Sequence, residues 1–322
     1  MIRMQKSWSL VAFLLLLCAC GPRGGKPAPT PTREFPSVDI PLMMDEPAEQ
    51  ASFVTLHFWD RFTDTAKVYA CDSTVVNGVK VDALESQVGL FATLLGQVPL
   101  EEGCQAVARL YDRIDAFKRK YPESNVFDEL GRQVSRYLYD ANSPVRNEDL
   151  YYPFAERLGR SDFLDEVERT VYEREARLCL LNRVGTPATD FSFTDTRGKV
   201  RTLYGVKADY LVLIFANPGC KACQDMTAAM KASPEISAHL ASGRLKVVDV
   251  YIDQEIDDWK AHIADYPADW INGYDQDYTI RTDLIYHVRA IPSMYLLDKD
   301  KTVLMKDAPQ EKLLGALVKL DE

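Results

Sequence analysis

The segment at residues 210–232 constrains the fold of this chain more than any other. It begins with a continuous apolar run at 210–215, which is typical of a strand buried on both faces. Cys220 and Cys223 follow a few residues later, and two methionines one helical turn apart come next. The two cysteines are therefore expected at the junction where a strand ends and a helix begins.

This position favours a reactive thiol at Cys220. The first turn of a helix presents unpaired N–H groups and the positive end of the helix dipole, and both stabilise a thiolate. Cysteines in this setting have pKa values of roughly 3.5–7.5 instead of about 8.5. The sequence predicts that Cys220 attacks a partner disulfide and that Cys223, one turn deeper, displaces the partner. A structural zinc site would need two further ligands, and no second pair is spaced for it.

The rest of residues 184–322 alternates between two patterns. Apolar runs at 245–252, 293–297 and 302–305 predict strands, and Trp259 and the leucines of 313–320 suit helices. This alternation indicates an α/β sheet with helices on both faces.

Residues 42–183 show helical spacing of apolar residues instead. The sets that repeat at three to four residues are Val54, Phe58 and Phe62; Leu84, Val88, Phe91 and Leu95; Val107, Leu110, Ile114 and Phe117; Val126, Leu130, Val134 and Leu138; and Phe163, Val167, Val171, Leu178 and Leu181. Pro99, Pro122 and Pro144 fall between the sets, where helices are expected to break. The prediction is an α+β chain of two domains, an N-terminal all-α helical domain of five or six helices followed by the C-terminal α/β domain.

The aromatic residues of the helical segment leave a choice between packing and binding. Phe53, His57, Phe58, Trp59 and Phe62 could line a binding surface, but a packed core is the expected interpretation. Tyrosines 137, 139, 151 and 152 are likewise expected to be half-buried between helices.

The N-terminal residues 1–19 are expected to be a targeting signal. Basic residues precede a short apolar run that ends at Leu17-Cys-Ala-Cys20, which resembles the bacterial lipoprotein signal. The resemblance implies cleavage before Cys20 and lipidation of Cys20, and the alternative is an ordinary secretory signal. Residues 20–41, rich in Gly and Pro, are expected to be a flexible tether to the membrane.

A second motif strengthens the interpretation of the cysteine pair. The segment 286–298 with its Ile291-Pro292 pair closely resembles the thioredoxin superfamily, in its membrane-tethered branch of the TlpA and ResA type. The resemblance implies a thioredoxin-like fold over 185–322, a cis Pro292 that faces the cysteines, and an Ile291 backbone free to bind substrate. The helical segment resembles the uncharacterised helical domain that precedes such a domain in some bacterial envelope lipoproteins.

Two departures from the family pattern concern the surroundings of the cysteines. Gly219 stands where relatives often have Trp, and Ile214 stands where many relatives have the acid that assists proton transfer. Asp225 is close in sequence but is expected to point to solvent. The sequence therefore assigns no residue to proton transfer.

The expected function is an envelope thiol–disulfide oxidoreductase without metal or organic cofactor. The resemblance favours reduction of disulfides in partner proteins, with electrons from a membrane donor. Nucleic acid is not expected as a partner, because the net charge is −10. One alternative is a lipid-anchored binding protein with the thioredoxin-like domain as scaffold, and another is Cu(I) delivery through Cys220, Cys223 and His287.

Three further cysteines, Cys71, Cys104 and Cys179, belong to the helical segment. One disulfide plus a buried thiol and three buried thiols are equally compatible with the sequence. A resolving role for one of them toward Cys220 is the remaining alternative.

Overall fold

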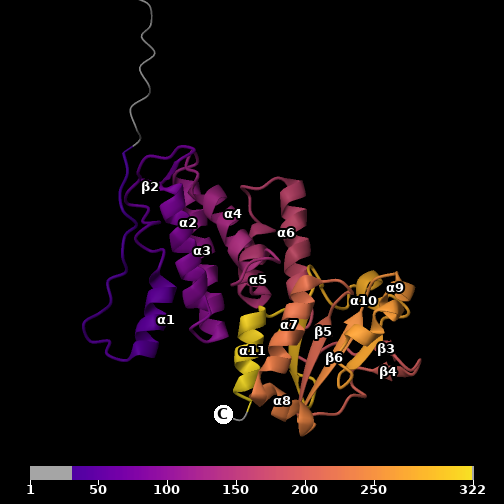
Figure 1. Cartoon of the computed structure of the whole chain (residues 1–322). Helices are drawn as coiled ribbons and strands as arrows, with labels where there is room; N and C mark the ends of the chain where they lie inside the picture. Colours follow the sequence, from indigo (N-terminus) through magenta and orange to yellow (C-terminus); the bar gives the residue numbers. More distant parts are fainter. Residues whose placement is uncertain (1–30, 321–322) are drawn as a thin grey trace, which may run out of the picture.

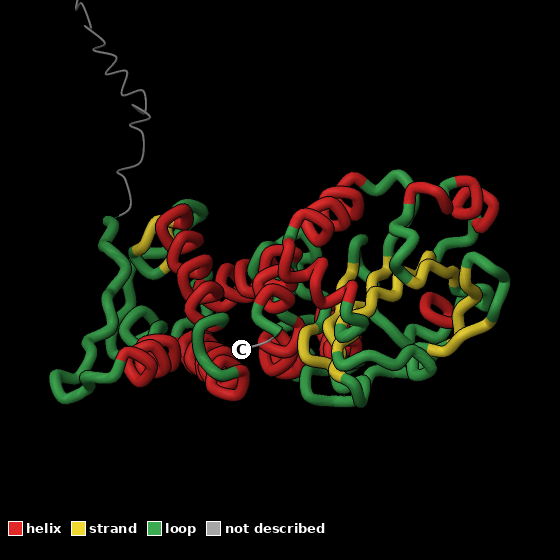
Figure 2. The backbone as a smooth tube through the Cα atoms, turned by 60° about the horizontal axis from the view of Figure 1, so that its bottom comes forward, coloured by secondary structure: helices red, strands yellow, loops and turns green. Residues whose placement is uncertain are grey.

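The computed structural model describes residues 31–320, and the predicted signal at 1–19 and the lipidation residue Cys20 lie outside them. Figure 1 shows a group of helices followed by a twisted sheet with helices packed on it, and Figure 2 shows that most of the strands gather at one end of the molecule, with a short strand pair at the other end. We call residues 31–183 the helical part and residues 184–320 the sheet part. None of the helices in the described range is long and apolar enough to cross a membrane.

Among the described residues, the helical part contains six helices. They are α1 (Pro47–His57), α2 (Val81–Leu95), α3 (Leu100–Lys120), α4 (Val126–Leu138), α5 (Glu148–Leu158) and α6 (Glu166–Cys179). Their apolar faces form one core, in which Leu84, Phe117 and Phe154 are fully buried. Pro99 stands directly before α3, so this predicted helix break is confirmed.

A short hairpin corrects the all-α prediction for this part. The strands β1 (Val75–Val76) and β2 (Val79–Lys80) pair antiparallel between α1 and α2. The two residues that join them, Asn77 and Gly78, have φ of 46° and 81°. Positive φ at both central positions matches the twist of a two-residue hairpin, and Asn-Gly is the sequence that adopts it most readily.

Two of the predicted helical faces were also wrong in part. The helix predicted through Phe62 ends at His57, and the chain continues in turns that still bury Phe58 and Phe62. In α6, Val167 and Val171 are 73% and 49% exposed. The helix packs against α5 through its other face, so these valines did not mark the buried side.

The sheet part contains a seven-stranded mixed sheet in the order β4-β3-β7-β6-β5-β8-β9. Its strands are β3 (Ser192–Asp195), β4 (Val200–Thr202), β5 (Tyr210–Phe215), β6 (Leu245–Tyr251), β7 (Ile271–Tyr274), β8 (Ser293–Asp298) and β9 (Val303–Met305). The central strand β5 runs parallel to β6 and antiparallel to β8. The predicted strands are confirmed, whereas β3, β4 and β7 were missed because each is short and mixes polar with apolar residues.

Helices and cores lie on the two faces of this sheet. The helices are α7 (Lys221–Ala232), α8 (Pro234–Ala241), α9 (Ile256–Ala261), α10 (Thr279–Thr282) and α11 (Gln310–Val318), with a 3-10 turn at Ile263–Asp265. Val212 and Ile214 of β5 point into the core under α7, α8 and α11, while Leu211 and Leu213 point into the opposite core. Figure 1 shows α7 and α11 side by side on one face.

Candidate active site

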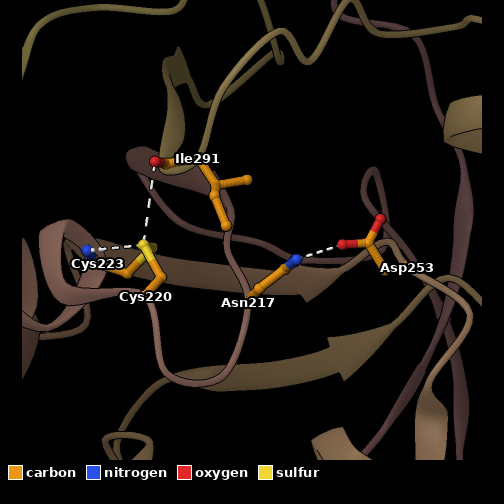
Figure 3. The surroundings of a disulfide bond; sticks show 5 residues. All are labelled: Asn217, Cys220, Cys223, Asp253 and Ile291. Carbon is orange, nitrogen blue, oxygen red and sulfur yellow. Dashed lines mark hydrogen bonds between the residues drawn. A yellow bond between two sulfur atoms is a disulfide. The ribbon is translucent and has the colours of Figure 1, made fainter.

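The structure places the cysteine pair at the junction that the sequence predicts. Cys220 is the N-terminal cap of α7, and its sulfur is bonded to that of Cys223 in a disulfide with an S–S distance of 2.20 Å. The Cys223 amide also donates a hydrogen bond to Cys220 Sγ at 3.2 Å (Figure 3). Cys220 is partly exposed, whereas Cys223 is only 7% exposed. Partner molecules can therefore reach Cys220 first.

The residues that flank Cys220 explain one departure from the family pattern. Gly219 has φ of +73°, a left-handed conformation that residues with a Cβ rarely adopt. A tryptophan at this position would be strained by the backbone itself. On the other side of Cys220, Lys221 forms an exposed ion pair with Asp225. Asp225 thus points outward as predicted, and its carboxylate offsets the charge of Lys221.

The second motif lies next to the disulfide, at the start of the neighbouring strand β8. The Ile291–Pro292 peptide bond is cis, as the resemblance implies. Ser293, the next residue, pairs with Phe215 at the end of β5, which places the two motifs side by side. The Ile291 carbonyl oxygen lies 4.0 Å from Cys220 Sγ (Figure 3). The structure therefore brings together the four sheet-part residues that the sequence singled out.

The loop between β5 and the disulfide is held by a polar contact that the sequence did not reveal. Asn217 donates a hydrogen bond from Nδ2 to Asp253, which follows β6 (Figure 3). Asp253 in turn forms an ion pair with Arg281 of α10 at 2.6 Å. These contacts fix the start of the disulfide loop against the neighbouring strand and helix.

A cavity of about 250 Å³ adjoins the disulfide on the α7 side. Its lining includes Cys220, Cys223, Asp249 and Tyr266. Asp249 is 4% exposed, and burial raises the pKa of its carboxyl to about 7. The hydroxyl of Tyr266 is buried without a hydrogen-bond partner among the described residues, and burial together with Asp249 raises its pKa. The cavity is large enough to hold several water molecules, and the Asp249 carboxyl and the Tyr266 hydroxyl are polar groups in its lining.

Asp249 is a candidate that the sequence analysis missed. It lies on β6 directly opposite Ile214 of β5, and position 214 is where the family resemblance led us to expect an acid. Asp249, on the adjacent strand, therefore lies close to the position where the acid was expected. The signal was present in the sequence, because Asp249 interrupts the otherwise apolar run Val247–Val250, and a charged residue inside a buried strand is rare.

The remaining cysteines stay apart from the site. Cys71, Cys104 and Cys179 are free thiols and form no disulfide with any residue of the described range. Cys179 is fully buried, and this burial raises the pKa of its thiol. Burial also raises the pKa of Cys104. The disulfide that the sequence allowed is therefore absent among these three residues, and the alternative of three buried thiols holds only in part, because Cys179 is buried while Cys71 and Cys104 are partly exposed.

The arrangement of His287 bears on the copper alternative. Its Nδ1 lies 3.2 Å from the Glu148 carboxylate, so the ring is engaged with the helical part. Across residues 31–320, no group of three or more His, Cys, Asp and Glu side chains is arranged to hold a metal ion. The structure thus gives no support to a site formed by His287 with the two cysteines.

Comparisons with known proteins cover both parts of the chain. A family model described as a domain of unknown function (DUF5106) matches residues 17–182. The crystal structure of a thioredoxin-like protein from Bacteroides caccae has 35% sequence identity and a TM-score of 0.77, and the match covers 90% of this chain and 99% of that chain. The C-terminal domain of an uncharacterized protein from Bacteroides fragilis has 46% identity and a TM-score of 0.41, covering 42% of this chain and 97% of that chain. No protein with a curated description matches.

The similarity to the Bacteroides caccae protein extends over most of this chain. It therefore includes the helical part and the sheet part, and its description agrees with the thioredoxin-like fold expected for the latter. On these matches, the chain belongs to the DUF5106 family, with the matched domain of unknown function followed by a thioredoxin-like fold.

Proposed function

We propose that this protein is an envelope thiol–disulfide oxidoreductase that reduces disulfides of partner proteins through Cys220 and Cys223. The observation that carries the proposal is the juxtaposition of an N-capping Cys220, bonded to Cys223, with the cis Ile291–Pro292 peptide 4.0 Å from its sulfur. This arrangement joins a redox-active sulfur pair to a backbone edge on which an extended substrate can bind.

The proposed reaction begins with the reduced protein. The Cys220 thiolate attacks one sulfur of the partner disulfide, whose second sulfur leaves as a thiolate and takes up a proton. The Cys223 thiol then loses its proton and attacks Cys220, which breaks the mixed disulfide and releases the partner's first sulfur. Two electrons have passed to the partner, and the protein holds the Cys220–Cys223 disulfide. A membrane dithiol donor is proposed to reduce this disulfide again.

We propose that Asp249 accepts the proton that the Cys223 thiol loses. Both side chains line the same cavity, and a carboxyl with a pKa of about 7 can exchange protons near neutral pH. Water in the cavity can carry the proton to solvent. The helix N-terminus stabilises the Cys220 thiolate in the reduced protein, because the Cys223 amide already points at that sulfur.

Replacement of Cys223 by Ala is expected to trap partner proteins. Cys220 would still attack, but no second thiol could resolve the mixed disulfide, so substrates would stay covalently bound. Non-reducing gels and mass spectrometry of material purified from the native host would identify them. The matched control is the Cys220→Ser/Cys223→Ala double variant, which is expected to trap nothing. Equal capture by both variants would contradict exchange at Cys220.

We propose that Cys20 anchors the protein to a membrane through a lipid. The support is the sequence Leu17-Cys-Ala-Cys20, which resembles a lipoprotein signal. Each buried methylene contributes about 0.8 kcal/mol, so several acyl chains would hold the protein at the surface. Mass spectrometry of the mature protein is expected to find an acylated N-terminal cysteine. An unmodified thiol at Cys20 would contradict the anchor while leaving the proposed redox chemistry intact.

A further inference from the structure

The Ile291–Pro292 peptide lies in a segment that no helix or strand holds in place. The helix α10 ends at Thr282, and β8 begins only at Ser293. A segment without ladder or helical hydrogen bonds takes its position from side-chain contacts on either side. The side-chain contacts of the residues that flank this peptide lead to the helical part.

These flanking residues join a group of polar and charged side chains between the two parts of the molecule. We call it the Glu148 cluster, and its members are Arg146, Glu148, His287, Arg289, Lys306 and Asp307. Glu148 begins α5 of the helical part. One of its carboxylate oxygens, Oε1, lies 3.2 Å from His287 Nδ1 and 3.0 Å from Arg289 Nε. Its other oxygen lies 2.7 Å from Lys306 Nζ.

The cluster also holds the residue that follows Pro292. Ser293 donates a hydrogen bond from Oγ to Asp307 at 2.8 Å. Asp307 is paired with Arg289 at 3.1 Å and with Arg146, which precedes α5, at 3.3 Å. The residues on both sides of the Ile291–Pro292 peptide are thus held by carboxylates. Glu148 belongs to the helical part, and Asp307 is paired with Arg146 of that part.

Burial makes these contacts strong and mutually dependent. The side chains of Glu148 and Lys306 are 1% and 2% exposed. Burial by itself would raise the pKa of Glu148, but His287, Lys306 and Arg289 together lower it to about 2. The carboxylate is therefore ionised at neutral pH. A buried charge that loses its partner leaves the opposite charges uncompensated, so the cluster resists rearrangement.

An aromatic contact adds to this interface. The guanidinium of Arg289 lies 4.4 Å from the centre of the Tyr139 ring, which follows α4. Tyr139 stacks in turn on Tyr151 of α5, with ring centres 4.7 Å apart. Arg289 is thereby held between a carboxylate and a ring that both come from the helical part, two residues before Ile291.

We propose that the helical part, through Glu148, positions the Ile291–Pro292 peptide against Cys220 and so forms a working component of the thiol site. This inference rests on the proposed function. Glu148 is a positioning residue, since it reaches the substrate backbone through His287 and Arg289. The inference assigns a role to the matched domain of unknown function. In the binding-protein alternative, this domain would instead act separately from the thiol site.

Glu148→Gln in the full chain is expected to loosen residues 286–292. Hydrogen–deuterium exchange of that segment should speed up about tenfold or more, since its backbone would lose the charged contacts that order it. For a protein disulfide such as insulin, kcat/KM should fall about tenfold, mainly through KM, because small misplacements of a positioned group are costly. Reduction of the Cys220–Cys223 disulfide by dithiothreitol should keep its rate, since this small reagent does not need the Ile291 backbone.

The matched control is Asp149→Asn, one residue further along α5. Asp149 is also buried and also ion-paired, at 3.0 Å to Arg183 where the helical part ends, and this ion pair includes no side chain of the cluster. This variant should leave the exchange of 286–292 and the KM unchanged. Glu148→Asp, which keeps the charge, should restore most of the wild-type behaviour.

Two outcomes would overturn the inference. One is unchanged exchange of 286–292 in folded Glu148→Gln, and the other is equal loosening in Asp149→Asn. If Glu148→Gln does not fold, the double variant Glu148→Gln/Lys306→Met, which removes one charge of each sign, undergoes the same test. If the wild type fails to reduce insulin, the proposed function fails, but the exchange measurement still decides whether Glu148 positions this segment.

Discussion

Replacement of Cys220 by Ser is expected to lower the rate of insulin reduction by on the order of 10³-fold or more, because the attacking sulfur is lost. Serine has nearly the same shape, and its hydroxyl can still cap α7 by accepting from the Cys223 amide. The fold should therefore persist. The measurement is the turbidity of precipitating insulin chains, with dithiothreitol as the electron source.

Cys71→Ser provides the control for this experiment. Cys71 is a free thiol of the helical part, and its sulfur contacts the Ser124 hydroxyl at 3.5 Å. Its replacement should leave the turbidity rate unchanged. Equal and negligible activity in wild type and Cys220→Ser would contradict the oxidoreductase proposal. That result would instead favour the binding-protein alternative, in which the thioredoxin-like fold is a scaffold.

Asp249→Asn is expected to stabilise the protein at pH 8 while leaving its stability near pH 4 little changed. The carboxyl pKa is about 7 in the folded protein and 3.8 in its unperturbed state, because burial disfavours the charged form. The folded state therefore holds this proton more tightly than the unfolded state does. It follows that stability falls as the pH rises from about 4 to about 7, and the lost stability stays lost above that range.

The amide cannot ionise, so Asp249→Asn avoids this loss. A shift of this size corresponds to at most about 4 kcal/mol at pH 8. Chemical denaturation of the oxidised protein at pH 4 and pH 8 measures the difference. The matched control is Asp225→Asn, an exposed carboxylate on α7 whose side chain is 55% accessible. Equal effects of the two variants at pH 8 would show that the Asp249 carboxyl is not ionising in a buried site.

The same variant is expected to slow the resolution of the mixed disulfide. General base catalysis typically contributes about 10²–10⁴-fold, and Asn cannot accept the proton of Cys223. Stopped-flow measurements with a fluorescent peptide disulfide would separate the attack by Cys220 from the resolution by Cys223. Asp249→Asn should lengthen the life of the mixed disulfide without changing the first step. A protein that is more stable yet slower would indicate that the buried carboxyl serves chemistry at the expense of stability.

Local patterns in the sequence were sufficient for most of the sheet part. A continuous apolar run predicted β5, and helical spacing after Cys223 predicted α7, so the junction that carries the cysteines followed directly. Short strands such as β4 escaped prediction because three residues of mixed character carry no period. On α6, Val167 and Val171 misled the prediction because a helix with one buried face also tolerates apolar residues on its other face.

What the sequence by itself determined is the chemistry of the site. Two cysteines at a strand–helix junction identify a dithiol, and the Ile291-Pro292 pair identifies its neighbour by resemblance. Only the tertiary structure decided which other groups surround them. Asp249 lines the cavity beside the disulfide because β6 lies beside β5, and Glu148 contacts His287, ahead of Ile291, because α5 packs against a segment about 140 residues further along the chain. Such contacts depend on the order of the strands and on the docking of the two parts. Neither produces a periodic pattern of residues from which it could be predicted.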